Sequence, residues 1–327
     1  EVFKYNLKEN IITAENDAII KDNIKNYKIS SNFISYLKSK KEIYTKGKTF
    51  AEIFSKYKLE SENVTLLIDS MELYSQEKTR ITDKLNLYEL EKFSYSINKE
   101  ELKGENILIN TNYNLPRNDK FYFKNAIINL NKQEFFGTNP KIKVHKDIFD
   151  NLDNDPRIVG ISASSNNNVT TVNKGVFTSC KQNENCTPWS IKADQIIHDK
   201  NKKEIIYNNA LLKIYDFPIL YFPKFFHPDP TVNRRSGFLK PQINNSNALG
   251  SSFSIPYYSV LDENKDFTFT PSIFENNLQM VQNEYREINK NSKFHSNFGF
   301  VNNYKSDLDT TKNSIFNLYL EDEIHQK

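Results

Sequence analysis

The sequence lacks any run of about 18 apolar residues, which excludes a transmembrane helix. Only a β-barrel could then carry this chain into a bilayer. An excess of either charge is also missing, because 44 Lys and Arg balance 41 Asp and Glu and leave a net charge of +3. A nucleic-acid-binding protein needs a concentrated basic face, so this balance argues against nucleic acid as a partner.

Cysteine, tryptophan and glycine are scarce, with 2, 1 and 8 residues respectively in a chain of 327. The two cysteines, Cys180 and Cys186, lie close together in the sequence. Such a pair suits a disulfide in an oxidising compartment, and two free thiols are an equally open alternative. The chain begins at Glu1 without a charged-then-apolar leader. We therefore expect either that a signal peptide has been removed or that the sequence is internal to a longer one.

Aromatic residues are abundant instead, with 24 Phe and 18 Tyr. Phe, Tyr, Ile and Thr favour strands, and short alternating segments such as Phe121-x-Phe123 predict an all-β chain. Residues 83–103 fit neither a helical nor a strand period clearly. We interpret the many Lys and Asn residues as compositional bias rather than as chemistry.

The first half of the chain contains internal repeats. Residues 27–45 match residues 57–75 at an offset of thirty, which is typical of stacked strand–turn–strand units. Within the units, two apolar residues recur fourteen positions apart. These pairs are Ile29 with Ile43, Leu59 with Leu73, Phe121 with Phe135, and Ile191 with Ile205. We expect all eight to face an interior that is apolar from end to end, which would be either an ordinary core or a track for a lipid chain.

The pattern changes in the second half. Residues 211–226 form the most apolar stretch, but Pro218 and Pro223 exclude a strand that is central throughout. After residue 250, alternating strands follow one another, as in an outer-membrane barrel or a soluble antiparallel sheet. A spanning strand with its turn takes roughly 12–15 residues, so residues 235–327 hold fewer than the roughly eight strands of a closed barrel. We expect one domain over residues 1–230 and an incomplete barrel over 231–327.

Catalytic and metal sites are not indicated. The Gly160–Ser164 segment lacks the second Gly of a nucleophile elbow. The pairs His198 with Asp199 and His227 with Asp229 offer too few ligands for zinc, which takes three or four. We expect no enzymatic activity, no metal and no cofactor.

Several sequence blocks occur in order between residues 175 and 271. They are Gly175–Cys180, Pro188–Ala193, Ile206–Ala210, Phe217–Pro223, His227–Leu239, Ile255–Tyr258 and Asn264–Pro271. Together these blocks resemble the LPS-assembly protein family of Gram-negative outer membranes, LptD, formerly called OstA. The repeats of residues 1–150 look, more weakly, like the OstA-type periplasmic roll of that family.

This resemblance implies an all-β fold, in which a periplasmic β-jellyroll is followed by the first antiparallel strands of an outer-membrane β-barrel. It implies lipopolysaccharide transport, with the roll interior guiding acyl chains to a laterally opening barrel. The implied partners are lipopolysaccharide, a plug lipoprotein of the LptE type and a periplasmic bridge jellyroll of the LptA type. We expect the bridge protein to dock on residues 2–12, and the chain to stop short of a full barrel at Lys327.

The resemblance also assigns roles to single residues. Pro241 and Pro256 match prolines that, in the family, weaken the seam between the first and last barrel strands and so form a lateral gate; proline removes a donor from the strand ladder. Cys180 matches a family cysteine, although no cysteine follows Cys186. Arg234 and Arg235 lie at the expected domain junction, where they could meet lipid phosphates or position the chain. The alternative function is a secreted β-solenoid that binds or cleaves a polysaccharide.

Overall fold

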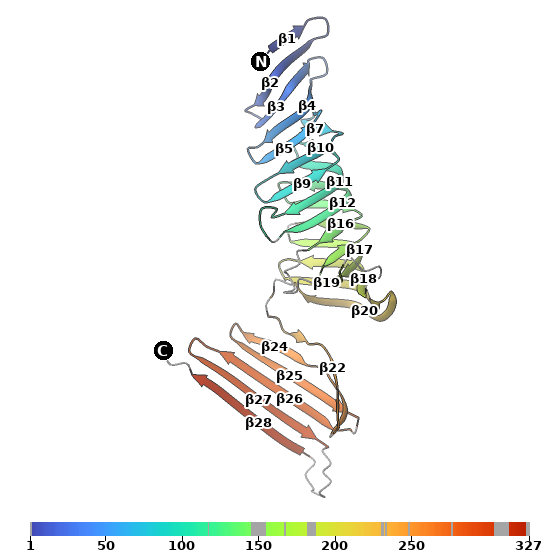
Figure 1. Cartoon of the computed structure of the whole chain (residues 1–327), viewed down its shortest axis with the longest axis vertical. Helices are drawn as coiled ribbons and strands as arrows, with labels where there is room; N and C mark the ends of the chain where they lie inside the picture. The colour runs from blue at the N-terminus through green and yellow to red at the C-terminus, as the bar shows by residue number, and fades with distance from the viewer. Residues whose placement is uncertain are drawn as a thin grey trace. The chain divides into compact units, whose positions relative to one another are not determined.

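The structure is a computed structural model that describes residues 2–116, 118–144, 155–166, 168–181, 188–229, 232, 234–247, 249–275, 277–303 and 314–324. It divides into two compact units, Glu1–Thr231 and Val232–Lys327, one residue from the boundary expected above. All its extended elements are β-strands (Figure 1). Among the described residues, no helix is long and apolar enough to cross a membrane.

The described residues of the first unit, called the roll below, form twenty strands. They are β1 (Val2–Asn6), β2 (Ile11–Asp22), β3 (Tyr27–Leu37), β4 (Glu42–Ile53), β5 (Tyr57–Glu62), β6 (Thr65–Leu67), β7 (Glu72–Ser75), β8 (Thr79–Thr82), β9 (Asn86–Leu90), β10 (Lys92–Ser96), β11 (Glu101–Thr111), β12 (Asp119–Asn129), β13 (Glu134–Thr138), β14 (Lys141–Lys143), β15 (Arg157–Val159), β16 (Ser162–Ser165), β17 (Val169–Thr178), β18 (Trp189–Asp199), β19 (Glu204–Ile214) and β20 (Phe217–Pro228).

The part of the second unit that the structure describes forms eight strands. They are β21 (Gly237–Phe238), β22 (Gln242–Ser246), β23 (Gly250–Ser254), β24 (Tyr257–Asp262), β25 (Lys265–Phe274), β26 (Gln279–Ile288), β27 (Ser292–Asn302) and β28 (Ser314–Ile324).

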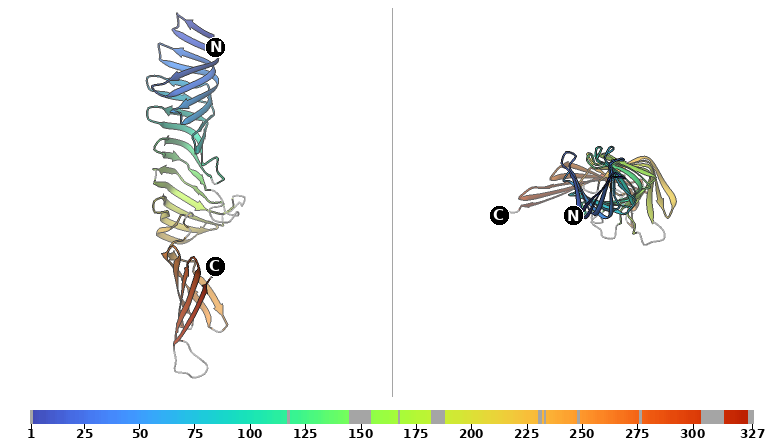
Figure 2. Two further views of the ribbon diagram at one scale, coloured as in Figure 1. Left: turned by 90° about the vertical axis from the view of Figure 1, so that its left-hand side faces the viewer. Right: turned by 90° about the horizontal axis from the view of Figure 1, so that it is seen from above.

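The roll is one antiparallel sheet that splits twice along its length (Figures 1 and 2). Between β4 and β11 it divides into the branches β5–β8–β9 and β6–β7–β10. Between β12 and β17 it divides into β14–β15 and β13–β16. We call the wall with β5, β8, β9, β14 and β15 the first wall, and the wall with the other branches the second wall. The long strands run through both walls, and their side chains form a single core cluster between them.

The two walls meet at a corner where the long strands kink. Residues with a left-handed backbone lie along it: Gly47 (φ 77°), Asn63 (50°), Asn106 (49°), Asn139 (49°) and Asn209 (50°). Glycine and asparagine tolerate this conformation, which costs other residues roughly 1–2 kcal/mol. The kinks fold the sheet so that one face of each wall looks into the same interior. The abundance of Asn is therefore not compositional bias alone, and our interpretation was wrong in this respect.

Side-chain hydrogen bonds hold the corner along the roll. The Gly47 amide donates to Asn63 Oδ1 over 3.0 Å. Asn106 donates through Nδ2 to Glu91 Oε2 (2.6 Å) and accepts at Oδ1 from the Tyr122 hydroxyl (3.0 Å). The same arrangement recurs near the other end, where Asn209 Nδ2 donates to Asp194 Oδ2 and the Tyr221 hydroxyl donates to Asn209 Oδ1 (2.9 and 3.0 Å).

The strands end where polar turns expose the backbone. Asp199 Oδ1 accepts hydrogen bonds from the amides of Asn201 and Lys202 (3.1 and 3.0 Å), which forms one such turn. The part of the apolar stretch that contains Pro218 and Pro223 lies in β20, which pairs with β19 alone among the described strands. The prediction that it could not be central is confirmed. Its exposed apolar side chains include Phe217, Ile219 and Tyr221.

The second unit is an antiparallel sheet in which β24, β25, β26, β27 and β28 pair in chain order. β22 pairs with β23, β23 pairs with β25, and the short β21 pairs with β24. Both units are built from strands, so the prediction of an all-β chain is confirmed.

Replacement of Asn63 tests the corner. Asn63→Ala removes the acceptor of the Gly47 amide and places alanine in a left-handed conformation, so we expect a loss of about 2 kcal/mol in the free energy of unfolding. Asn63→Asp keeps the acceptor and should cost less than about 0.5 kcal/mol. Urea unfolding followed by fluorescence of Trp189, the single tryptophan and a residue of the roll, measures both. Equal losses in the two variants would contradict this role of the corner.

Candidate functional site

The roll interior is the candidate site, and the fourteen-residue spacing has a structural cause in it. From Ile29 the chain runs along β3, turns and returns on β4, so that Ile43 lies on the opposite wall. The step from Leu59 on β5 to Leu73 on β7 crosses between the walls in the same way. The recurring spacing therefore marks pairs of residues on facing walls.

All eight residues of these pairs belong to the interior. Ile29, Ile43, Leu59 and Leu73 are buried, each no more than 4% exposed. The other four are partly buried and pack against the core cluster: Phe121, Phe135, Ile191 and Ile205. The structure thus brings these residues into one continuous apolar cluster, and their contact with a lipid stays a prediction.

The interior also contains a seam of buried hydroxyl groups beside the corner. Thr45 and Thr49 share a 2.7 Å hydrogen bond, and so do Ser61 and Thr79. The Ser75 hydroxyl donates to the Glu62 carbonyl over 2.6 Å. Partnered hydroxyls can be buried at little cost. The expectation of an interior apolar from end to end was therefore wrong, although the hydroxyls at alternating strand positions could have indicated the seam.

Aromatic side chains connect the two walls at three levels. Tyr57 on β5 meets Tyr95 on β10, with ring centroids 6.5 Å apart and planes at 63°. Phe121, next to β14, meets Phe135 on β13 at 6.0 Å. Further along, Phe177, next to β15, contacts Tyr207 of β19 at 6.4 Å. Edge-to-face and tilted aromatic pairs of this kind stabilise packing, so these contacts hold the walls together.

The N-terminal end of the interior is hollow. A cavity of about 590 Å³ lies between Tyr27 and Ile20 near one wall and Tyr36, Ile43 and Ile68 near the other. Its lining is mostly apolar, with Lys21, Asp22 and Asn23 among the residues at its rim. The cavity could admit an apolar chain while its polar end stays near water.

The opposite end of the interior is filled by aromatic rings. Phe177 contacts Trp189 (5.8 Å between centroids) and His227 (6.5 Å). Tyr207 hydrogen-bonds His227 Nε2 over 3.0 Å. Burial among these rings lowers the pKa of His227 and raises the pKa of the Tyr207 hydroxyl, so both groups are neutral near pH 7.

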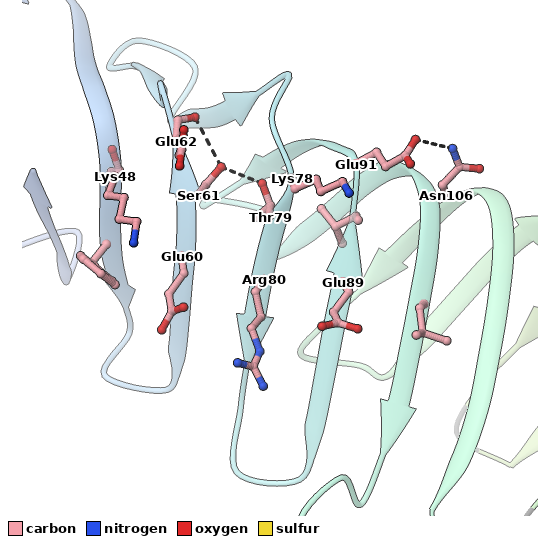
Figure 3. Close-up of a pocket in the computed structure, with 14 residues that line it drawn as sticks. Lys48, Glu60, Ser61, Glu62, Lys78, Thr79, Arg80, Glu89, Glu91 and Asn106 are labelled. Atoms are coloured by element: carbon pink, nitrogen blue, oxygen red, sulfur yellow. Dashed lines mark hydrogen bonds between the residues drawn. The ribbon is translucent and has the colours of Figure 1, made fainter.

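The outer face of the roll carries a groove with charged side chains. A groove of about 520 Å³ crosses β4, β5, β8, β9 and β11 there. Cross-strand pairing sets Arg80 opposite both Glu60 and Glu89, as Figure 3 shows. Opposite charges on neighbouring strands stabilise a sheet, so these residues have a structural reason to be there.

The second unit brings the two expected gate prolines together. Pro241 lies between β21 and β22, and Pro256 lies between β23 and β24. Phe238 pairs with Tyr257, and Gln242 pairs with Ser254. Between these two pairs, the three residues 239–241 lie opposite the two residues 255–256, so the ladder is interrupted. The Leu239 amide donates to the Pro256 carbonyl within this interruption (2.8 Å). The ladder is thus irregular at both prolines.

The two faces of the second unit differ in polarity. One face pairs Phe253 with Ile273, Tyr257 with Phe269, and Phe300 with Phe316. On the other face, Ser254 hydrogen-bonds Ser272 over 2.8 Å, and Thr268 pairs with Glu284. Strands with one apolar and one polar face are the pattern of a barrel wall in a membrane.

Arg234 at the junction has a defined position within the second unit. Its guanidinium donates to Asp266 Oδ2 (2.7 Å) and to the Tyr258 hydroxyl (3.0 Å). Arg286 donates to the other oxygen of the same carboxylate over 2.8 Å. Arg235 follows and is half-buried. Sequence reasoning missed this network. The hydrogen bonds of Arg234 to protein atoms favour the positioning role over contact with lipid phosphates, and the role itself stays a prediction.

The cysteines are only partly described. Cys180 is half-buried with its Sγ 3.7 Å from the Trp189 carbonyl oxygen. Cys186 lies outside the described residues, so the disulfide stays a prediction.

Three curated relatives carry the name LPS-assembly protein LptD. The protein of Pseudomonas entomophila is 28% identical over 256 residues, which is 77% of this chain and 24% of the relative. Those of Legionella pneumophila (strain Paris) and Yersinia enterocolitica are 32% and 36% identical over 127 and 122 residues, or 38% and 37% of this chain and 15% of each relative.

No family model matches the chain. The chain spans between 15 and 24% of the length of these relatives. The matches nevertheless cover up to 77% of the chain. These relatives therefore support the LPS-assembly protein LptD family for this chain.

Proposed function

We propose that this chain transports lipopolysaccharide toward the outer membrane, with the acyl chains travelling between the two walls of the roll. The observation that carries this proposal is the continuous apolar cluster between facing walls, hollow at its N-terminal end. The names of the relatives, as LPS-assembly proteins, supply the class of lipid.

The energetics favour such a track. Burial of each CH2 group contributes about 0.8 kcal/mol, so acyl chains gain much by entering a dry interior. Side chains fill the interior beyond the cavity, so the walls must separate to admit a lipid. The branches β5–β8–β9 and β6–β7–β10 face one another through side chains, which can part without breaking the strand ladders.

We propose further that the roll lies in the periplasm and the second unit in the outer membrane. The apolar face of β23, β25 and β27 supports contact with lipid, and its polar face supports a barrel lumen. A plug lipoprotein of the LptE type would occupy that lumen once the barrel is complete.

A photo-reactive amino acid at interior positions tests the track. At Ile43 it should capture lipopolysaccharide during transport, because this side chain faces the interior. At Tyr44, the next residue on β4 and an exposed one, capture should be at least five-fold weaker. Gel analysis of the crosslinked adducts measures both, and equal capture at the two positions would refute the interior path.

The N-terminal edge of the roll is the proposed docking site for a bridge jellyroll of the LptA type. All five residues of β1 are exposed, and β1 pairs with β2 alone among the described strands. β1 covers β2 only from Ile11 to Glu15, so Ala18–Asp22 of β2 have a strand partner on one side, in β3. A similar roll could add its strand to this edge.

Pairs of proline substitutions at alternate residues of β1 test this docking. Consecutive amides of an antiparallel edge strand point alternately toward the partner and away from it. One of the two pairs, Phe3→Pro with Tyr5→Pro or Val2→Pro with Lys4→Pro, should therefore abolish pulldown of the bridge protein without changing the Trp189 unfolding transition. The other pair should loosen β1 from β2. Full binding by both double variants would exclude this edge.

The lateral gate is proposed for the interruption at Pro241 and Pro256. Both prolines remove ladder donors where pairing is already irregular, which would weaken the seam between the first and last strands of the complete barrel. A weak seam there would let lipid leave sideways into the bilayer.

Restoring the donors should close this gate. In cells that depend on the full-length protein, Pro241→Ala with Pro256→Ala should lower surface lipopolysaccharide at least two-fold, measured by antibody labelling of intact cells. Pro116→Ala, in a turn of the roll, serves as the matched control and should have no effect. Normal surface labelling in the double variant, at equal protein levels, would argue against the gate.

A further inference from the structure

The contact between Tyr57 and Tyr95 differs from the other contacts between the walls. Both side chains are 1% exposed, and among the described residues neither hydroxyl makes a hydrogen bond of ordinary geometry, although the Lys56 ammonium group interacts electrostatically with the Tyr57 hydroxyl. The Phe121–Phe135 contact carries no polar atom. At the third contact, the Tyr207 hydroxyl has a partner in His227. Among these three contacts of the described residues, the Tyr57–Tyr95 contact alone buries hydroxyl groups without ordinary hydrogen bonds, which makes the closed arrangement less stable than its packing alone would allow.

The Tyr57–Tyr95 contact also has a defined place along the roll, next to the N-terminal cavity. Tyr27, which lines the N-terminal cavity, pairs with Ile53, and Ile53 pairs with Tyr57 on the next strand. On the other wall, Tyr95 pairs with Leu73. The tyrosine pair is thus the first aromatic contact between the walls beyond the cavity. A lipid moving along the interior from the cavity would meet it before the two other contacts.

The surroundings of the pair suit an anionic amphiphile. The exposed Lys56 places its ammonium group 4.8 Å from the centre of the Tyr57 ring. An ammonium group and two hydroxyl donors would thus lie where an apolar interior meets water. Phosphate or sugar oxygens next to acyl chains present matching acceptors at this boundary.

We propose that Tyr57 and Tyr95 form a clasp that closes the roll beyond the N-terminal cavity and opens for an amphiphile. Acyl chains then enter between the walls, and the freed hydroxyls donate to polar oxygens at the head of the same molecule. The missing hydrogen bonds of the closed state are made in the open, loaded state, which favours opening when lipid is present. This inference rests on the proposed function and adds the residues that admit the lipid.

The double variant Tyr57→Phe with Tyr95→Phe tests the clasp, because it keeps the rings and removes only the hydroxyls. Its thermal midpoint should rise by a few degrees, since no unpartnered hydroxyl remains buried. A diazirine amino acid is placed either at Ile43, which lines the cavity, or at Ile128, a buried residue of β12 beyond the clasp. With purified lipopolysaccharide as the probe, the double variant should capture lipid normally at Ile43 and at least three-fold less at Ile128.

Tyr88→Phe is the matched control, since Tyr88 is a buried tyrosine two strands from Tyr57 in the same wall. It should leave the ratio of capture at the two positions unchanged. If the double variant captures lipid at both positions as well as the unsubstituted protein does, or better, the clasp is refuted. The proposed function would be unaffected by that result. Absence of capture at both positions in the unsubstituted protein would overturn the proposed function itself, and the clasp with it.

Discussion

The left-handed kinks along the corner determine what the roll can do. An antiparallel sheet with one apolar face must cover that face, and this sheet does so by folding onto itself rather than by adding a second layer. Gly47, Asn63, Asn106 and Asn209 supply the backbone conformation, and hydrogen bonds such as that from the Gly47 amide to Asn63 Oδ1 fix it. The facing walls, the hollow end and the aromatic contacts between the walls all follow from this fold.

Joining the walls at one side only has a functional consequence. The long strands run on through the corner from one wall to the other, whereas the free margins of the walls meet through side chains such as Tyr57 and Tyr95. Separation of the margins costs packing but no strand hydrogen bonds, so the interior can open without unfolding. A closed barrel of the same size would have to break a ladder to admit a lipid.

Much of this arrangement could be predicted from the sequence because it depends on local periodicity. The fourteen-residue spacing identified Ile29, Ile43, Leu59 and Leu73 as interior residues, since a strand, a turn and a return are all short-range features. The corner could not be predicted, because its Asn residues do not stand out in a sequence rich in Asn. Residues 83–103 were ambiguous because the split sheet uses strands of only five residues there, β9 and β10, too short to show a period.

In the second unit, too, local features could be predicted from the sequence and long-range contacts could not. Alternation along β25 and β27 predicted strands with one apolar face, which the structure contains. The carboxylate of Asp266 instead joins Arg234 and Arg286, which lie 32 and 20 residues away in the sequence. Such contacts depend on register between strands and carry no local signal.

Trp189 allows the most direct test of an interior lipid path. It is the single tryptophan and packs against Phe177 in the core cluster, 5.8 Å between ring centroids. Bromine atoms quench tryptophan fluorescence on contact, so a lipid A analogue with brominated acyl chains should quench Trp189 on binding, whereas the same analogue without bromine should not. Equal fluorescence with the two analogues, at saturating binding of both, would show that the acyl chains do not run between the walls.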